Sequence, residues 1–362
     1  MKWSMQSTWS VALLALGLTA PLFADPQPPA AKAEGSGVEI RVEPLMALHF
    51  WMRQMAEAKG EPAKKSGAAE AVAVVRRIEG ELGGWLAWGI VDGVFDGVKD
   101  SAELARIAPQ LPEEVALRGG GKLHLRAALR DLAAAYGALE PRFLAETWPG
   151  WKKDLERNAA ELKSSLVPKL PQVWADVGRH LDLAAPKEPV PVYLVYHAPF
   201  PGAVTFRSDT GPVVAISLTT AARELYEEIV IHELLHALDV LAAGDNVLSR
   251  LRSRLGALPG ASPRAVHDFV HTLMFAQAAG TTRAVFDPKH RDYGDLAGYY
   301  PKVPEATAVV VPAWRSYLEG KTTREAALDR IAEGFAARAA EKTKGDPKAA
   351  PKTNAGSGGG GG

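Results

Sequence analysis

Two histidines and a glutamate within residues 229–239 have the types and spacing of a metal site. His232, Glu233 and His236 form the pattern H-E-x-x-H inside an otherwise apolar run. Residues four apart in a helix lie on one face about one turn apart, so both imidazoles can reach one metal ion while Glu233 lies beside it. This spacing predicts a zinc site that carries its own general base.

The residues around this motif predict a helix over 225–241, because most of its positions are apolar. The exception is one polar stripe at helical spacing: Glu228, His232, Glu233, His236 and Asp239. Burying an unpaired polar group costs about 2–7 kcal/mol, and a bound metal would satisfy the stripe. Thr219 or Thr220 is expected to cap this helix, and Gly244 to follow its end. The alternative is a pair of core histidines with local hydrogen bonds.

A catalytic zinc needs a third protein ligand and an open position for water. The chain has no cysteine, so this ligand is expected to be His, Asp or Glu. The Ser-Pro pair at 262–263 predicts the start of a second helix that ends at Gly280. His267 and His271 lie four apart on that helix, and one of them is the expected third ligand. The competing candidates are Asp239 and Glu305.

Other side chains are expected to support the metal and the reaction. Asp239 is better suited to orient an imidazole through a hydrogen bond than to bind the metal. A donor for the oxyanion that develops during hydrolysis is expected after the second helix. Tyr293 and Tyr300 are the first candidates, and His290 and Arg291 are weaker ones. The spacing of these four residues along the chain does not distinguish between them. We assign the role of oxyanion donor to Tyr293.

The start of the chain predicts export. Residues 1–24 contain a lone Lys2, an apolar run at 9–18 and small residues near the expected cleavage site. This pattern is typical of a secretory signal peptide rather than a membrane span, with an uncleaved N-terminal anchor as the alternative. We therefore expect a secreted or periplasmic protein with no integral membrane association after cleavage.

The composition restricts the partners. The chain has 42 basic and 42 acidic residues among 362, with no long basic run before the C-terminal tail. Nucleic acid and anionic membrane surfaces are therefore not expected partners. The lack of cysteine excludes disulfides, so stability must come from core burial. We expect a monomer that acts on a peptide or protein substrate.

The predicted fold class is α+β and helix-dominated, with two lobes between a leader and a tail. Residues 25–37 are rich in Pro, Ala and Gly and predict a flexible linker. Residues 38–185 predict a short strand followed by a helical lobe, and residues 186–342 predict the catalytic lobe. Residues 343–362 are rich in Lys, Pro and Gly and predict a disordered tail.

Short β-rich runs at 38–42, 192–196, 203–206 and 213–217 predict the strands. In the catalytic lobe we expect a small, mostly antiparallel sheet that leads directly into the motif helix. Its edge strand would be able to take up an extended peptide by strand addition. The Asp-Thr-Gly triplet at 209–211 is expected to be a hairpin turn, because aspartic protease chemistry needs two carboxylates that share a proton.

Three aspartates, Asp92, Asp96 and Asp100, lie four residues apart in the predicted helical lobe. This spacing lacks the alternation and the closing Glu of an EF-hand loop. A solvated helix face is therefore the preferred interpretation of these three residues.

The H-E-L-L-H sequence at 232–236, preceded by a β segment, resembles the zincin superfamily of zinc metallopeptidases. The chain departs from the metzincin branch, because Ala242 stands where a third histidine is expected. It also departs from the simplest gluzincin spacing, because residues 248–259 contain no Glu. Residues 38–56, the motif helix and the region from 271 to 321 together resemble a group of exported bacterial zincin-like proteins.

This resemblance implies a zincin-like catalytic lobe in which Zn²⁺ is bound by His232, His236 and His271, in preference to His267. It also implies hydrolysis of peptide bonds by zinc-bound water, with Glu233 as the general base. Two alternatives remain on the same scaffold. The chain would then be a zinc-dependent hydrolase of a non-peptide amide, or a non-catalytic exported binding protein.

Overall fold

The computed structural model describes residues 37–58, 68–82, 88–117, 121–199, 202–219, 221–242 and 244–345. The predicted signal peptide, nearly all of the predicted linker and most of the predicted tail lie outside these residues. Among the described residues, no helix is both long and apolar enough to cross a membrane. The described chain is dominated by helices and has one small sheet and a separate strand pair, which confirms the α+β class.

The main sheet contains four strands in the order β1-β4-β6-β5. These strands are β1 (Val38–Arg41), β4 (Val190–Leu194), β5 (Ala203–Ser208) and β6 (Gly211–Ile216). β1 pairs in parallel with β4, and β4 in parallel with β6; only β5 and β6 are antiparallel. The prediction of a mostly antiparallel sheet is therefore wrong. The returning strand of the β5–β6 hairpin inserts next to β4, and β4 is buried at every position, as expected of a central strand.

Strand β1 belongs to residues 38–185, which were predicted as a short strand followed by a helical lobe, and it pairs with β4 of the predicted catalytic lobe. Both predicted lobes therefore contribute to one sheet, and one hydrophobic cluster extends through both of them. A second, two-stranded antiparallel sheet joins β2 (Val115–Ala116) and β3 (Lys122–Leu123).

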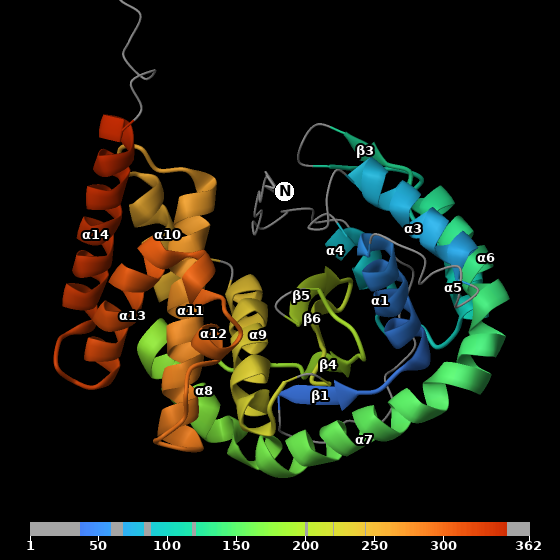
Figure 1. The fold of residues 1–362 in the computed structure, drawn as a ribbon, viewed down its shortest axis with the longest axis horizontal. Helices are drawn as coiled ribbons and strands as arrows, with labels where there is room; N and C mark the ends of the chain where they lie inside the picture. Colours follow the sequence, from blue (N-terminus) through green and yellow to red (C-terminus); the bar gives the residue numbers. More distant parts are fainter. Residues whose placement is uncertain are drawn as a thin grey trace, which may run out of the picture.

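Helices flank the main sheet on two sides (Figure 1). Those before the sheet strand β4 are α1 (Pro44–Glu57), α3 (Ala69–Leu82), α4 (Gly89–Asp92), α5 (Ser101–Ile107), α6 (Leu125–Arg142), α7 (Trp148–Ser165) and α8 (Leu170–Leu181). Those after it are α9 (Tyr226–Leu241), α10 (Val247–Gly256), α11 (Pro263–Val285), α12 (Tyr293–Leu296), α13 (Pro304–Leu318) and α14 (Arg324–Gly345). Helix α9 lies between the sheet and α11 (Figure 1).

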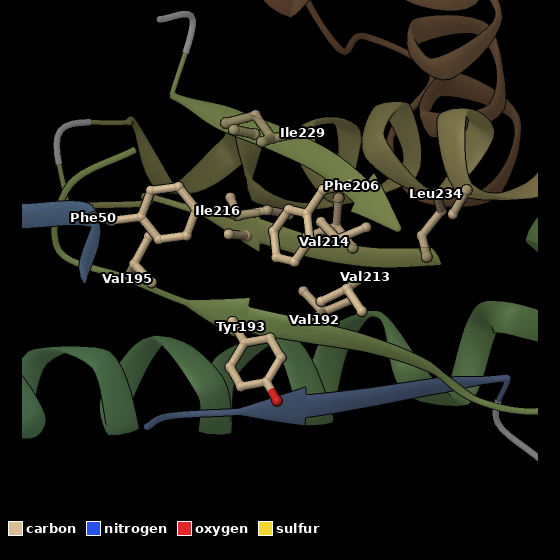
Figure 2. Close-up of a cluster of buried hydrophobic side chains, with 14 of the residues drawn as sticks. Phe50, Val192, Tyr193, Val195, Phe206, Val213, Val214, Ile216, Ile229 and Leu234 are labelled. Atoms are coloured by element: carbon tan, nitrogen blue, oxygen red, sulfur yellow. The ribbon is translucent and has the colours of Figure 1, made fainter. Parts of the chain in front are cut away.

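The core around the sheet fixes the position of α9. Ile229 and Leu234 of α9 and Phe206 of β5 are buried together with apolar side chains of β4 and β6 (Figure 2). Burial of a Leu, Ile or Phe side chain contributes about 1.5–3 kcal/mol. This packing holds one face of α9 on the sheet, so the face with the polar stripe is set relative to β5.

The start of α9 differs from the prediction. Its N-cap residue is Leu225, which has no side-chain cap, because a 3₁₀ turn at Arg223–Leu225 leads into the helix. Thr219 instead donates to the carbonyl oxygen of Tyr196 at 3.0 Å, so its predicted capping role is wrong. Thr220 lies outside the described residues.

The predicted start of α11 is confirmed, because the Ser262 hydroxyl accepts from the backbone N–H of Ala265 at 3.2 Å. The predicted end at Gly280 is wrong, since the helix continues to Val285. A Cβ at position 280 would collide with Leu318 of α13. Glycine therefore permits the close approach of two helices here and does not end one.

The interpretation of the three aspartates as a solvated helix face is also wrong. Asp92 is 1% exposed and the Asp96 side chain is 8% exposed, while Asp100 caps α5 by accepting from the N–H of Glu103.

The Asp96 carboxylate accepts hydrogen bonds from Arg41, Tyr193, Ser208 and Thr210. It thereby holds the 209–211 turn, which joins β5 to β6 as predicted.

Asp92 is the centre of a buried polar network that joins α1, α4 and α6. Its carboxylate accepts from His49 Nε2 at 2.8 Å and from Arg53 Nη1 at 2.6 Å. A carboxylate only accepts, so His49 Nε2 carries the proton that is donated to Asp92. In a neutral imidazole Nδ1 is then an acceptor, and it accepts from the Tyr136 hydroxyl at 2.9 Å. Burial lowers the pKa of His49, so the network contains a neutral imidazole and one Asp–Arg ion pair.

We expect Asp92→Ala to lower the free energy of unfolding by about 3–5 kcal/mol, because removing one partner leaves the other charge buried and unpaired. Urea denaturation followed by circular dichroism measures this loss. The control is Asp131→Ala, which removes an exposed ion pair with Arg77 and should cost less than about 1 kcal/mol. Equal losses in the two variants would contradict the proposed role of the buried network.

Candidate metal centre

Three histidine side chains converge between α9 and α11. His232 and His236 lie on successive turns of α9, and His271 lies on α11. The Nε2 atom of His232 is 3.0 Å from Nε2 of His271 and 3.2 Å from Nε2 of His236. Among the described residues, these three form the only group of His, Asp or Glu that meets the spacing of a metal site.

The three imidazoles fit a zinc ion. Tetrahedral coordination with Zn–N bonds of about 2.0–2.1 Å places ligand nitrogens about 3.3 Å apart, close to the distances observed. Burial lowers the pKa of His236 to about 4 and the pKa values of His232 and His271 well below the ordinary value. The rings are therefore neutral near pH 7, with nitrogen lone pairs available for a metal.

Aromatic rings enclose the ligand cluster. The His232 ring stacks on Phe275 of α11 with centroids 3.9 Å apart, and Phe275 stacks on Tyr299 at 4.3 Å. Tyr299 also meets the His271 ring edge-on, with centroids 5.0 Å apart. Sequence reasoning missed both aromatic residues. Phe275 follows His271 by one helical turn, which was a usable signal, but no spacing relates Tyr299 to the motif.

Glu233 is turned toward β5. It is 5% exposed, and its Oε2 atom accepts from the Thr205 hydroxyl at 2.8 Å. Burial raises the pKa of Glu233 to about 7, although the bond from Thr205 opposes that shift. A carboxyl group with this pKa is able to accept and to release a proton near neutral pH. Thr205 is a further site residue that the sequence did not reveal.

Tyr293 begins α12, and its hydroxyl lies near the backbone that precedes β5, the strand that contacts Glu233. A Cβ on Gly202, which precedes β5, would lie 3.7 Å from the Tyr293 hydroxyl oxygen. Burial raises the pKa of Tyr293, and the negative charges of Glu233 and Glu228 raise it further. The hydroxyl therefore keeps its proton and is able to act as a hydrogen-bond donor.

The remaining candidates for a third ligand lie outside the group of three histidines. The His267 ring is 5.0 Å from the His271 ring, and burial lowers the pKa of His267 to about 3. Asp239 accepts from Arg252 at 2.7 Å and from Asn246 at 3.4 Å. The prediction that Asp239 orients an imidazole is therefore wrong. Glu305 lies in the first turn of α13.

The structure also places the other three donor candidates. The Tyr300 hydroxyl donates to Asp292 at 3.5 Å, His290 bonds to Glu228, and Arg291 is exposed. Of the two tyrosines, Tyr293 is the one whose pKa the charge of Glu233 raises, after the larger effect of burial. No protein-family model matches the sequence, and no curated protein or solved structure matches it significantly.

Proposed function

We propose that this chain is a secreted or periplasmic zinc-dependent metallopeptidase. The observation that carries the proposal is the convergence of three neutral imidazoles, from His232, His236 and His271, beside the buried carboxyl group of Glu233. These three residues would hold a zinc ion, and three protein ligands are the number that catalytic zinc sites use. The resemblance of the H-E-L-L-H sequence to zincins supports the same assignment.

The reaction follows from the side chains present. A zinc ion held by these imidazoles would supply hydroxide near neutral pH, because zinc lowers the pKa of a bound water to about 7. Glu233 takes a proton from the attacking water as the new C–O bond forms at the peptide carbonyl carbon. It then gives that proton to the amine nitrogen as the C–N bond breaks. Tyr293 donates a hydrogen bond to the carbonyl oxygen as negative charge develops on it.

Strand β5 gives the substrate a place to bind. It is an edge strand of the sheet, and Thr205 within it contacts the general base. Gly89 and Gly93 approach Phe206 and Arg207 closely, so helix α4 and the turn after it pack against the second half of β5. An extended peptide added at the first half of β5, by strand addition, would pass beside Glu233.

Elemental analysis of the purified mature protein tests the proposal. We expect about one zinc ion per chain, and a small fraction of that in His236→Ala and in His271→Ala. His267→Ala is the matched control, because it removes a neighbouring imidazole from outside the cluster and should retain zinc. Absence of zinc from the parent protein after loading would overturn the proposal. Loss of zinc from His267→Ala but not from His271→Ala would identify His267 as the third ligand.

A further inference from the structure

Glu228 is buried, and only one of its two carboxylate oxygens has hydrogen-bond partners among the described residues. It lies on α9 one turn before His232 and is fully buried. His290 Nε2 and the backbone N–H of Tyr293 both bond to its Oε2 atom, at 2.5 Å and 2.7 Å. Its Oε1 atom has no hydrogen-bond partner among the described residues. One carboxylate oxygen therefore holds the segment that carries Tyr293, while the other has spare capacity.

His232 has the complementary group. Its Nε2 atom faces His236 and His271, and its Nδ1 atom is buried with no hydrogen-bond partner in the part of the chain that the structure describes. Leaving a buried polar atom unpaired costs about 1–3 kcal/mol. Two such unpaired atoms, Glu228 Oε1 and His232 Nδ1, therefore belong to residues one turn apart on the same helix.

The spacing of these two residues makes them partners. Residues four apart lie on one helix face, and helical side chains lean toward the N-terminus, so His232 covers the turn that carries Glu228. When Nε2 of a neutral imidazole binds a metal, Nδ1 carries the proton and usually donates it to a carboxylate, a carbonyl or water. An acceptor atom is available at Glu228 Oε1.

We propose that Glu228 is a positioning residue that accepts a hydrogen bond from His232 Nδ1, directly or through one enclosed water molecule. The inference rests on the proposed zinc site. In this arrangement one carboxylate fixes the tautomer and ring orientation of a metal ligand through Oε1, and it holds the start of α12 through Oε2. The position of the zinc ligand and the position of Tyr293 are then set by the same side chain.

Zinc affinity measured by competition with a chromophoric chelator tests the proposal. We expect Glu228→Gln, which preserves side-chain shape, to weaken zinc binding about 10–100-fold, the usual effect of removing such a partner. Glu227→Gln is the matched control, because Glu227 is the neighbouring residue, is also buried, and pairs with Arg223 and Ser165 instead. The control should bind zinc as tightly as the parent.

A second measurement separates positioning from folding. In zinc-loaded protein labelled with ¹⁵N-histidine, the His232 ring is identified by its stacking on Phe275 with centroids 3.9 Å apart, because the His271 ring lies farther from Phe275, at 5.0 Å. We expect its Nδ1–H proton to exchange slowly in the parent and in Glu227→Gln, and to shift and exchange faster in Glu228→Gln. Glu228→Asp, which keeps the charge on a shorter side chain, provides a second variant if Gln prevents folding.

The outcomes distinguish this inference from the proposed function. A parent that binds no zinc overturns both. A parent that binds zinc through the three histidines, with unchanged affinity and an unchanged Nδ1–H signal in the Glu228 variants, overturns only the role of Glu228. Equal weakening in the Glu227 and Glu228 variants would show a general effect on α9 and would also overturn it.

Discussion

Replacing Glu233 by Gln is expected to lower kcat/KM for peptide hydrolysis about 10²–10⁴-fold, the contribution typical of a general base, while zinc content stays at the parent value. Gln is close to Glu in shape and can still accept the hydrogen bond from Thr205. It cannot take a proton from water. Because Glu233 lies outside the ligand group, the metal should be retained.

Cleavage of a library of fluorescence-quenched peptides measures this loss, and elemental analysis of the same samples measures zinc. Asp239→Asn is the matched control, since Asp239 is on the same helix but pairs with Arg252; it should keep most of the activity. Undiminished cleavage by Glu233→Gln would contradict the general-base role. Zinc without cleavage of any peptide by the parent would favour a non-peptide amide substrate or a non-catalytic binding protein.

Replacing Tyr293 by Phe is expected to lower kcat about 10²–10³-fold, as does removal of one oxyanion donor in other hydrolases. KM should change little, because the hydrogen bond to the carbonyl oxygen strengthens only as negative charge develops. The ring keeps its place, since the backbone N–H of Tyr293 still bonds to Glu228. Steady-state kinetics on one cleaved peptide separates the two constants.

Tyr300→Phe is the control for this second variant. It makes the same change in a nearby buried tyrosine whose hydroxyl bonds to Asp292, so it should affect stability more than kcat. Similar losses of kcat in both variants would indicate that Tyr293 acts through packing. A loss confined to KM in Tyr293→Phe would assign its hydroxyl to substrate binding and would contradict the oxyanion role.

Local sequence determined much of the scaffold. The strand at Val38 and the helix that carries His232 follow from periodicity, and both occur nearly where they were predicted. The Ser262 cap likewise follows from its side chain and the next residue. These features depend on interactions between residues that are close along the chain, so a short stretch of sequence is enough to predict them.

The tertiary structure decided the features that depend on distant partners. Periodicity could not order the strands, because pairing of β1 with β4 joins residues about 150 positions apart. Spacing could not show that Asp92 is buried, since its partners His49 and Arg53 are on another helix. It also could not choose between His267 and His271, which differ by one turn.

The sequence by itself thus determined the H-E-x-x-H motif and the helix that carries it, because His232 and His236 are four residues apart. The packing of α11 against α9 decided which further imidazole joins them and brought His271 within 3.0 Å of His232. The hairpin β5–β6 brought Thr205 to Glu233. A site assembled from separate elements is fixed by how their apolar faces pack, and that packing is a property of the whole core.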